Sequence, residues 1–456
     1  MSSGVDEIGS LDWRGTDGLG GGDLLVRRAH ALDPRSGLDR ECDLLIRAGR
    51  IAEIVAAGDG ELRDGGEEID AAGLHAFPGF FDPHVHLRTP GQEYREDIES
   101  GTRAAAAGGY CGIVAMANTD PVVDDPAIVT ALRERAAAEA VVPTGFVATV
   151  TRGMAGRELS EMAALREAGA LGFSDDGLPI ADAGVMRRAL QYQRLAGGTI
   201  LLHEEDPALS GDGVMGEGAV SAALGLAGVP DVSESTMIAR DGALCRYEDA
   251  RAHVQHLSAR SSVEAVAAAR EAGVRLSAEL TPHHLVLTDE EVRSLDARFK
   301  MNPPLRTEDD RQALIEALRS GIVGCIGTDH APHAGHEKEV PFEVANMGVT
   351  GLETAFAALY TELVLPGIVD LGLIVERMGA GAAIFDLEPA RIEIDAEADI
   401  ALVDLDAEWE AGADGWESRS ANSCFAGRML RSRPVITVVA GAVAYRRREF
   451  TMKVAS

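Results

Sequence analysis

The chain has 456 residues, of which 46% are hydrophobic and 25% charged, and its formal net charge at pH 7 is −32. This composition is typical of a water-soluble globular protein, and so acidic a chain is a poor candidate for binding nucleic acid. No apolar run approaches the roughly eighteen residues that predict a transmembrane helix. The five cysteines are scattered without a CxxC pair, which favours reduced thiols in a cytoplasmic protein.

The two ends of the chain predict one small β-domain. Residues 1–22 are rich in Gly, Ser and Asp and lack the features of a signal peptide, so we expect a disordered tail there. Residues 23–75 and 391–450 both contain alternating apolar runs separated by turn residues, such as CDLLIRAGRIAEIV and RPVITVVAGAVAYRR. We predict that these two segments pair into a β-sandwich beside the central domain.

The central segment, residues 76–390, alternates short apolar runs with longer amphipathic stretches, several of which end at glycine. Eight such runs separated by helical patterns predict an α/β fold, a (β/α)8 TIM-like barrel. The predicted strands are 76–81, 112–117, 144–150, 170–173, 199–203, 252–257, 274–280 and 321–327.

Polar residues follow the predicted strands, at the end of a barrel where active sites lie. The first strand runs into FDPHVHLR, in which His84, His86 and Arg88 share one face because side chains alternate along a strand. An isolated HxH pair is equally compatible with ordinary strand packing. Whether it binds metal therefore depends on which residues follow the other strands. They contribute Asn118, Asp175, Asp176, His203, His256, Asn302, Asp329 and His333.

This set of imidazoles and carboxylates predicts a site for one or two divalent metals. Nitrogen and oxygen donors without thiolate favour zinc, with manganese or cobalt as alternatives. Of the adjacent pair Asp175 and Asp176, we expect one to face the metals. We expect Glu204 and Glu205 to support the site or to lie on the surface.

The motifs together resemble the amidohydrolase superfamily and, within it, the type-I bacterial dihydroorotases. The resemblance runs from PGFFDPHVHLRTPGQEYREDIESGTRAAAAGGY through MANTDP, FSDDG, HVQHLS, MNPPLR and GTDHAPH to VTGLETAF. It implies that His84, His86 and Asp329 hold one zinc, that His203 and His256 hold a second, and that Asp176 bridges them. The implied substrate contacts are His86, Arg88, Asn118, Asn302, His333, Met347 and Gly348.

The scarcity of lysine supports this assignment over related families. Hydantoinases and allantoinases use a carboxylated lysine from the fourth strand as the metal bridge, and this chain has no lysine before Lys300. There are also departures from the family pattern, at Ala117, Glu204 and Met347, and none of these is an implied metal ligand.

The resemblance implies reversible cyclisation of N-carbamoyl-L-aspartate to dihydroorotate, the third step of pyrimidine biosynthesis. As a hypothesis, Asp329 takes a proton from the attacking water and passes it to the leaving ring nitrogen, while Arg88 grips a substrate carboxylate. Two alternatives stay open: another cyclic-amide hydrolase, or an inactive scaffold for aspartate carbamoyltransferase. From the family we also expect a homo-oligomer, and the carbamoyltransferase is a candidate partner.

Overall fold

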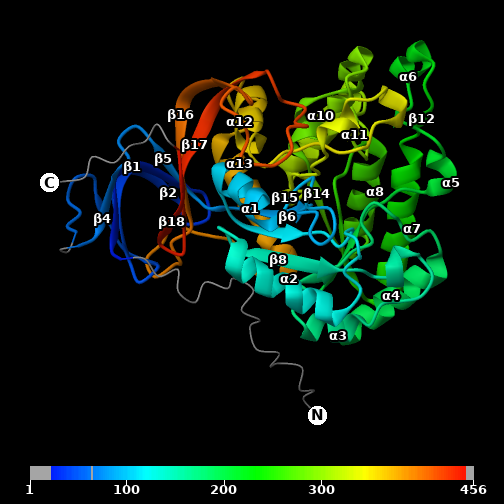
Figure 1. Ribbon diagram of the computed structural model, residues 1–456, viewed down its shortest axis with the longest axis horizontal. Coiled ribbons are helices and arrows are strands. Elements are labelled where there is room, and N and C mark those ends of the chain that lie inside the picture. The colour runs from blue at the N-terminus through cyan, green and yellow to red at the C-terminus, as the bar shows by residue number, and fades with distance from the viewer. Residues whose placement is uncertain (1–21, 63–64, 448–456) are drawn as a thin grey trace.

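The computed structural model describes residues 22–62 and 65–447, which form a barrel and a sheet built from both chain ends. Figure 1 shows the sheet at the left and the barrel at the right. Apart from Gly22, the predicted tail lies outside the described residues, as do residues 448–450 of the second predicted sheet segment. Among the described helices, none has both the length and the apolar character needed to cross a membrane.

The barrel contains eight parallel strands that pair in chain order, and the (β/α)8 prediction is confirmed. Its closing contact joins the first strand to the last, where the amide of His86 donates to the carbonyl of His330 at 2.8 Å. The first two strands are buried along their whole length, as expected for parallel strands covered by helices. The strands are β6 (Phe80–Val85), β7 (Tyr110–Ala115), β8 (Thr144–Ala148), β9 (Gly172–Phe173), β10 (Thr199–Leu202), β13 (Arg251–Val254), β14 (Arg275–Leu280) and β15 (Cys325–Ile326).

A helix follows each barrel strand, and local sequence sets its ends. In the seventh of them, Thr307 accepts the amide of Asp310 and Asp310 bonds back to Thr307, while Gly321 ends the helix at a φ of 77°. The eight covering helices are α1 (Ile98–Ala107), α2 (Pro126–Glu139), α3 (Met162–Glu167), α4 (Ala183–Ala196), α7 (Val232–Glu248), α8 (Arg260–Glu271), α10 (Glu308–Ser320) and α13 (Leu371–Gly379). Shorter helices lie in the connections: α5 (Pro207–Ser210), α6 (Ala219–Leu224), α9 (Pro282–Val286), α11 (Gly335–Lys338) and α12 (Ala355–Leu359).

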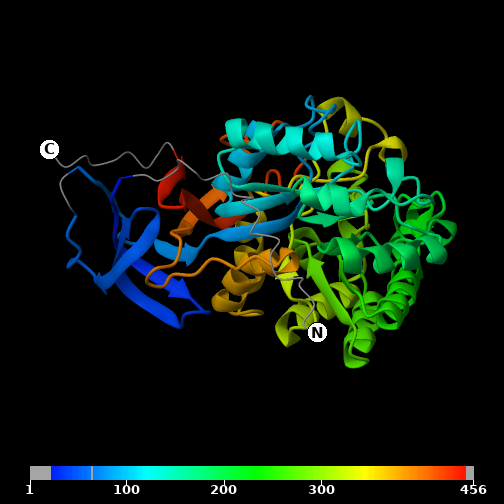
Figure 2. The same cartoon turned by 90° about the horizontal axis from the view of Figure 1, so that it is seen from below.

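The second sheet joins the two ends of the chain, as predicted. Its strands pair in the order β18-β17-β16-β5-β1-β2-β3, with β4 beside β1, and they enclose a hydrophobic core of their own. Figure 2 shows the strands from the amino-terminal end beside those from the carboxyl-terminal end. The strands are β1 (Leu24–Asp33), β2 (Leu38–Arg47), β3 (Arg50–Ala56), β4 (Glu67–Asp70), β5 (His75–Pro78), β16 (Ile400–Glu410), β17 (Met429–Val439) and β18 (Ala442–Arg446). A separate two-stranded pair consists of β11 (Met215–Gly216) and β12 (Gly228–Val229).

The predicted strand 76–81 is wrong as a single strand, because two sheets share this run. Residues up to Pro78 pair with β1 and β16 of the terminal sheet, and the barrel strand begins only at Phe80. Gly79 lies between them, and its amide donates to the carbonyl of Asp399 at 2.9 Å. A continuous apolar run therefore hides a change of sheet.

The other seven predicted strands all differ from the observed strands at one or both ends. The second is Tyr110–Ala115 in place of 112–117, and the eighth is Cys325–Ile326 in place of 321–327. Gly321 caps the end of α10. The apolar residues Ile322 and Val323 that follow it pack into the hydrophobic core, and the strand begins only at Cys325.

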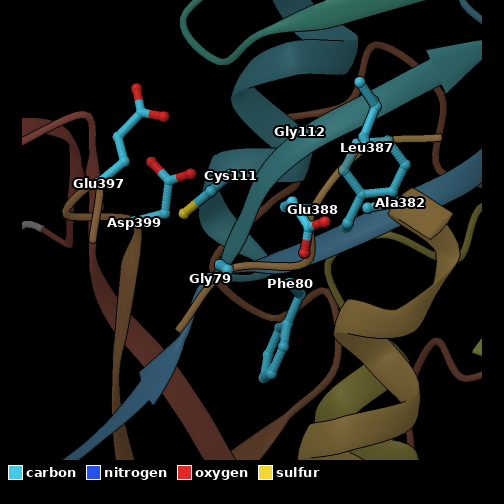
Figure 3. A pocket seen from close by; sticks show the side chains of 11 residues that line it. Gly79, Phe80, Cys111, Gly112, Ala382, Leu387, Glu388, Glu397 and Asp399 are labelled. Atoms are coloured by element: carbon cyan, nitrogen blue, oxygen red, sulfur yellow. The ribbon is translucent and has the colours of Figure 1, made fainter. Parts of the chain in front are cut away.

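A cavity of about 160 Å³ lies at the junction, at the amino ends of β6 and β7. Figure 3 shows Cys111 beside Asp399, with Glu397 and Glu388 nearby. The junction is tight, since a Cβ at Gly79 would meet the sulfur of Cys111 at 2.3 Å. This end of the strands is opposite the polar residues that follow them, and in such barrels it serves stability.

Candidate metal centre

Six predicted ligands converge at the carboxyl ends of the barrel strands. Two groups have ligand atoms that all lie within 4.8 Å of one another: His84, His86 and Asp329 in one, and His84, Asp176 and His256 in the other. His203 adjoins the second group. All six side chains are buried: His84, His86, Asp176, His203, His256 and Asp329.

The first group gathers two imidazoles around one carboxylate. Asp329 Oδ1 lies 3.1 Å from His86 Nε2 and 3.5 Å from His84 Nε2. Asp329 has a φ of 47°, a conformation that costs energy outside glycine and persists where surrounding contacts hold it. The backbone therefore turns this carboxylate toward the histidines of the first strand.

Asp176 lies at the centre of the second group. Its Oδ1 is 3.6 Å from His84 Nε2, 3.6 Å from His203 Nδ1 and 3.7 Å from His256 Nε2. Its Oδ2 is 3.4 Å from His86 Nε2. One carboxylate thus reaches all four imidazoles, the arrangement needed for a bridge between two cations.

The donors fit bound divalent metal. Among the described residues, Asp176 Oδ1 is buried and accepts no hydrogen bond, although a carboxylate oxygen without a partner is costly to bury. His203 Nδ1 and His256 Nε2 face one another at 2.9 Å, and nitrogens so placed share a single proton or a cation. Imidazole nitrogen and carboxylate oxygen are common ligands of zinc and related divalent ions.

The carboxylates and imidazoles of the site shift each other's pKa values in the direction that favours their charged forms. Burial opposes the charge of Asp176, but the imidazoles of His84, His203 and His256 hold its pKa well below the usual range. Burial opposes protonation of His203 in turn, and the neighbouring carboxylates of Asp176 and Glu205 raise its pKa to about 10. Without metal, protons on His84 and His203 therefore supply positive charge beside the carboxylates.

Glu279 is part of the site and was missed from the sequence. This buried residue of β14 lies with Oε1 2.7 Å from His84 Nδ1 and Oε2 3.2 Å from His253 Nε2. Burial opposes its charge, yet His84 and His253 lower its pKa to about 2. The contact leaves His84 Nε2 to face Asp176 and Asp329. The only signal in the sequence was one acidic residue inside an otherwise apolar strand end.

Both predicted asparagines lie against ligands. Asn118 Oδ1 is 2.8 Å from His86 Nδ1, and its amide nitrogen donates to Asp176 Oδ2 at 3.3 Å. Asn302 donates to Glu205 Oε2 at 2.7 Å, and Glu205 in turn lies 3.3 Å from His203 Nε2. The expectation that Glu205 supports the site agrees with this contact.

Asp175 points away from the ligand cluster. Its oxygens accept the amides of Val150 and Thr151 at 2.8 and 3.1 Å and the hydroxyl of Thr151. Burial raises the pKa of this carboxyl to about 6 despite these bonds. Of the adjacent aspartates, only Asp176 therefore faces the histidines.

Arg88 supplies a cation beside the cluster. Its Nε donates to the carbonyl of Pro332 at 3.2 Å, and its Nη2 lies 3.5 Å from His333 Nε2. Burial lowers the pKa of Arg88 to about 10, so it stays charged at neutral pH. Within the described chain Arg88 forms no ion pair, which leaves a buried guanidinium able to bind an anionic ligand.

His333 and the predicted backbone contacts lie together on the same side. His333 Nε2 donates to the carbonyl of Met347 at 2.8 Å, and Gly348 packs next to the ring. Burial and the charge of Arg88 lower the pKa of His333 to about 3, so the imidazole is neutral. The charged guanidinium of Arg88 can therefore bind a carboxylate, with the neutral His333 ring beside it.

Comparison with known proteins gives a consistent result. A family model described as Dihydro-orotase-like matches residues 74–262. The chain is similar to the dihydroorotase of Syntrophotalea carbinolica, with 42% identity over 424 residues that cover 93% of this chain and 99% of that protein. The dihydroorotase of Geobacter sp. strain M21 is also 42% identical, over 92% of this chain and 99% of its own length.

Solved structures share the fold. The L-hydantoinase from Arthrobacter aurescens superposes with a TM-score of 0.82 at 25% identity, covering 92% of this chain and 95% of that one. The dihydropyrimidinase from Brevibacillus agri, at 23% identity and a TM-score of 0.79, shows the architecture alone. Identity above 40% over nearly the full length of both chains is a much closer relation than this shared fold, and the chain belongs to the dihydroorotase family.

Proposed function

We propose that this protein is a dihydroorotase that catalyses the reversible cyclisation of N-carbamoyl-L-aspartate to dihydroorotate and water. The observation that carries the proposal is the unpaired guanidinium of Arg88 beside a buried cluster of imidazoles and carboxylates. Such a site combines a cation for a substrate carboxylate with ligands for a metal. The similarity to dihydroorotases along the whole chain supports the same substrate.

We propose two zinc ions, one held by His84, His86 and Asp329 and one by His203 and His256, with Asp176 between them. When bound, zinc polarises a carbonyl and lowers the pKa of water, which supplies a nucleophile at neutral pH. Glu279 holds His84 in position, and Asn118 does the same for His86.

Asp329 is the proposed proton carrier. Its carboxylate takes a proton from the attacking water and delivers it to the ring nitrogen that leaves the carbonyl carbon. In the direction of ring closure the same carboxylate removes the proton from the carbamoyl nitrogen. Arg88 binds the substrate carboxylate that does not react, with His333, Asn118, Asn302 and the Met347–Gly348 backbone around the rest of the molecule.

The experiment is an assay of dihydroorotate ring opening with purified protein, with chelator, and with zinc restored. We expect chelator to abolish turnover and zinc to restore it. Asp329→Asn should lower kcat by about 10²–10⁴-fold, the usual contribution of a proton-transfer group. The matched control is Arg152→Met, which removes an exposed charge that pairs with Glu161 and not with a predicted ligand.

Two outcomes would replace this assignment. Turnover of hydantoin or allantoin without turnover of dihydroorotate would establish another cyclic-amide hydrolase. A wild-type protein that binds no metal and turns over none of these substrates would establish the scaffold alternative.

The family resemblance further leads us to propose a cytoplasmic homo-oligomer that can associate with aspartate carbamoyltransferase. Sedimentation of the purified protein, alone and mixed with that enzyme, tests both parts. A monomer that does not co-sediment would reject them.

A further inference from the structure

Lysine is rare in this chain, and its positions are informative. Of 42 basic residues, only Lys300, Lys338 and Lys453 are lysine. The two that the structure describes, Lys300 and Lys338, are only 3% and 8% exposed, whereas lysine is seldom buried. Both lie beside the segment that follows the eighth barrel strand.

Lys338 ends α11, and its ammonium joins two segments of backbone. Nζ donates to the carbonyls of Asn346 at 2.8 Å, Gly348 at 2.9 Å and Lys300 at 3.1 Å. An ammonium has three N–H donors, so these three carbonyls use its whole capacity. The planar fork of arginine cannot converge on three acceptors in this way.

Lys300 makes the reciprocal tie. Its Nζ donates to the carbonyls of Phe342 at 2.8 Å and Glu343 at 2.9 Å, and it lies 5.5 Å from the centre of the Phe342 ring. The amide of Gly348 donates to the carbonyl of Lys300 at 3.0 Å. We call the pair Lys300 and Lys338 the lysine clamp, because it fixes residues 342–348 to the chain at residue 300.

The clamp ends at the proposed substrate contacts. The carbonyl of Gly348 also accepts from the Asn422 side chain at 3.1 Å, and Asn422 Oδ1 accepts the amide of His333 at 3.1 Å. Gly348 has a φ of 133°, and a Cβ there would meet His333 Nε2 at 2.9 Å. Gly348 therefore lies next to the His333 ring, with no room for a side chain between them.

We propose that Lys338 is a positioning residue for the reaction, which holds the Met347–Gly348 backbone and, through it, His333 where they bind substrate. The inference rests on the proposed function, since it assigns these groups to dihydroorotate. Lys338 itself does not touch the ligand cluster. Its loss would remove one donor from each of three carbonyls. The carbonyls of Gly348 and Lys300 would keep their bonds to Asn422 and to the Gly348 amide, so the tie between the loop and residue 300 would be weakened.

The test compares Lys338→Met, Lys338→Arg and the control Arg152→Met in the zinc-loaded enzyme. We expect Lys338→Met to raise KM for dihydroorotate by about tenfold while kcat changes less than about threefold, because the lost interaction serves binding before and during the reaction. Lys338→Arg should not restore KM, because charge alone does not fill three converging acceptors. A wild-type KM in Lys338→Met would overturn the proposal. So would a rise in KM and a fall in kcat that are the same in all three variants.

Amide hydrogen exchange gives a readout that needs no turnover. In Lys338→Met we expect faster exchange across residues 339–348 and unchanged exchange in β7. Unchanged exchange in both segments would overturn the clamp even if the enzyme is a dihydroorotase. If the wild-type protein does not turn over dihydroorotate, the proposed function fails, and exchange then decides separately whether the clamp holds the loop.

Discussion

The carboxylate of Glu279 orients the side chains of two histidines at the metal centre, His84 and His253. It lies within hydrogen-bonding distance of His84 Nδ1 and His253 Nε2. The amide of His256 also donates to it at 3.4 Å. Histidines that bind metal commonly donate their second N–H to a carboxylate, which fixes the ring and makes it a better ligand. Glu279 therefore contacts His84, which belongs to both groups of ligands, and His256 of the second group.

Replacement of this carboxylate tests that role. Glu279→Gln keeps the size of the side chain but removes its charge, and we expect zinc affinity to fall by about 10–100-fold. Competition with a chromophoric chelator measures this directly. Ser277→Ala is the control, because Ser277 bonds to His253 on the far side and contacts no ligand. Wild-type zinc affinity in Glu279→Gln would contradict the assignment.

Spacing and position explain which site residues could be predicted. His84 and His86 lie two apart at a strand end, so the alternation of a strand predicted their common face. Glu279 belongs to no motif, and its role appears only when the closed barrel brings the end of β14 close to residues at the ends of β6 and β13. Arg88 was predicted from strand alternation, but its φ of 56° shows that the strand has ended and that the backbone turn places it.

At the scale of elements, residues 411–428, which connect β16 to β17 of the terminal sheet, reach the carboxyl ends of the barrel strands. Two carboxylates hold this connection. Buried Glu96 accepts the amide of Arg419 at 3.1 Å, and half-buried Glu353 accepts those of Glu417 and Ser418 at 3.1 Å. Asn422, from the same connection, reaches His333. The sequence did not predict this, because the contacts join residues that lie far apart in the chain and in no shared motif.

The carboxyl of Glu353 makes the free energy of unfolding depend on pH. Burial raises its pKa to about 7, above the value near 4.3 expected in the unfolded chain. The protonated form is thus favoured by folding, and its contribution is complete below about pH 4 and lost as pH rises through 7. Glu353→Gln stays neutral, so its free energy of unfolding relative to wild type should rise between pH 5 and pH 8 by about 2 kcal/mol.

Urea unfolding at the two pH values measures that difference. Glu161→Gln, at an exposed position, is the control and should show no such change with pH. A difference between Glu353→Gln and wild type that is the same at pH 5 and pH 8 would contradict the prediction.

At the scale of the whole molecule, the core of the barrel extends into the terminal sheet, which also has a smaller core of its own. The largest hydrophobic cluster includes barrel residues together with Val403 and Val439 of the sheet. Phe356 packs 5.5 Å from Phe77 in the sheet and 5.4 Å from Phe80 in the barrel, measured between ring centres. Two units joined in this way should unfold together.

Two spectroscopic signals can test this cooperativity. In a Trp13→Phe background the remaining tryptophans, Trp409 and Trp416, report on the sheet and its connection, and circular dichroism at 222 nm reports mainly on the barrel helices. We expect coincident unfolding curves, and Phe356→Ala should shift both by about 3–5 kcal/mol. Curves with separate midpoints, or a shift of one signal alone, would show independent domains.

The buried lysines also give the protein an unusual chemical property. Lys300 and Lys338 carry the only side-chain amines among the described residues, and both are shielded from solvent. A reagent that acylates amines should therefore leave these two positions unmodified in the native protein and reach them only when the chain opens. The fraction of chains acylated at Lys300 and Lys338, measured by mass spectrometry, would then report the fraction of molecules that have unfolded, without any engineered label.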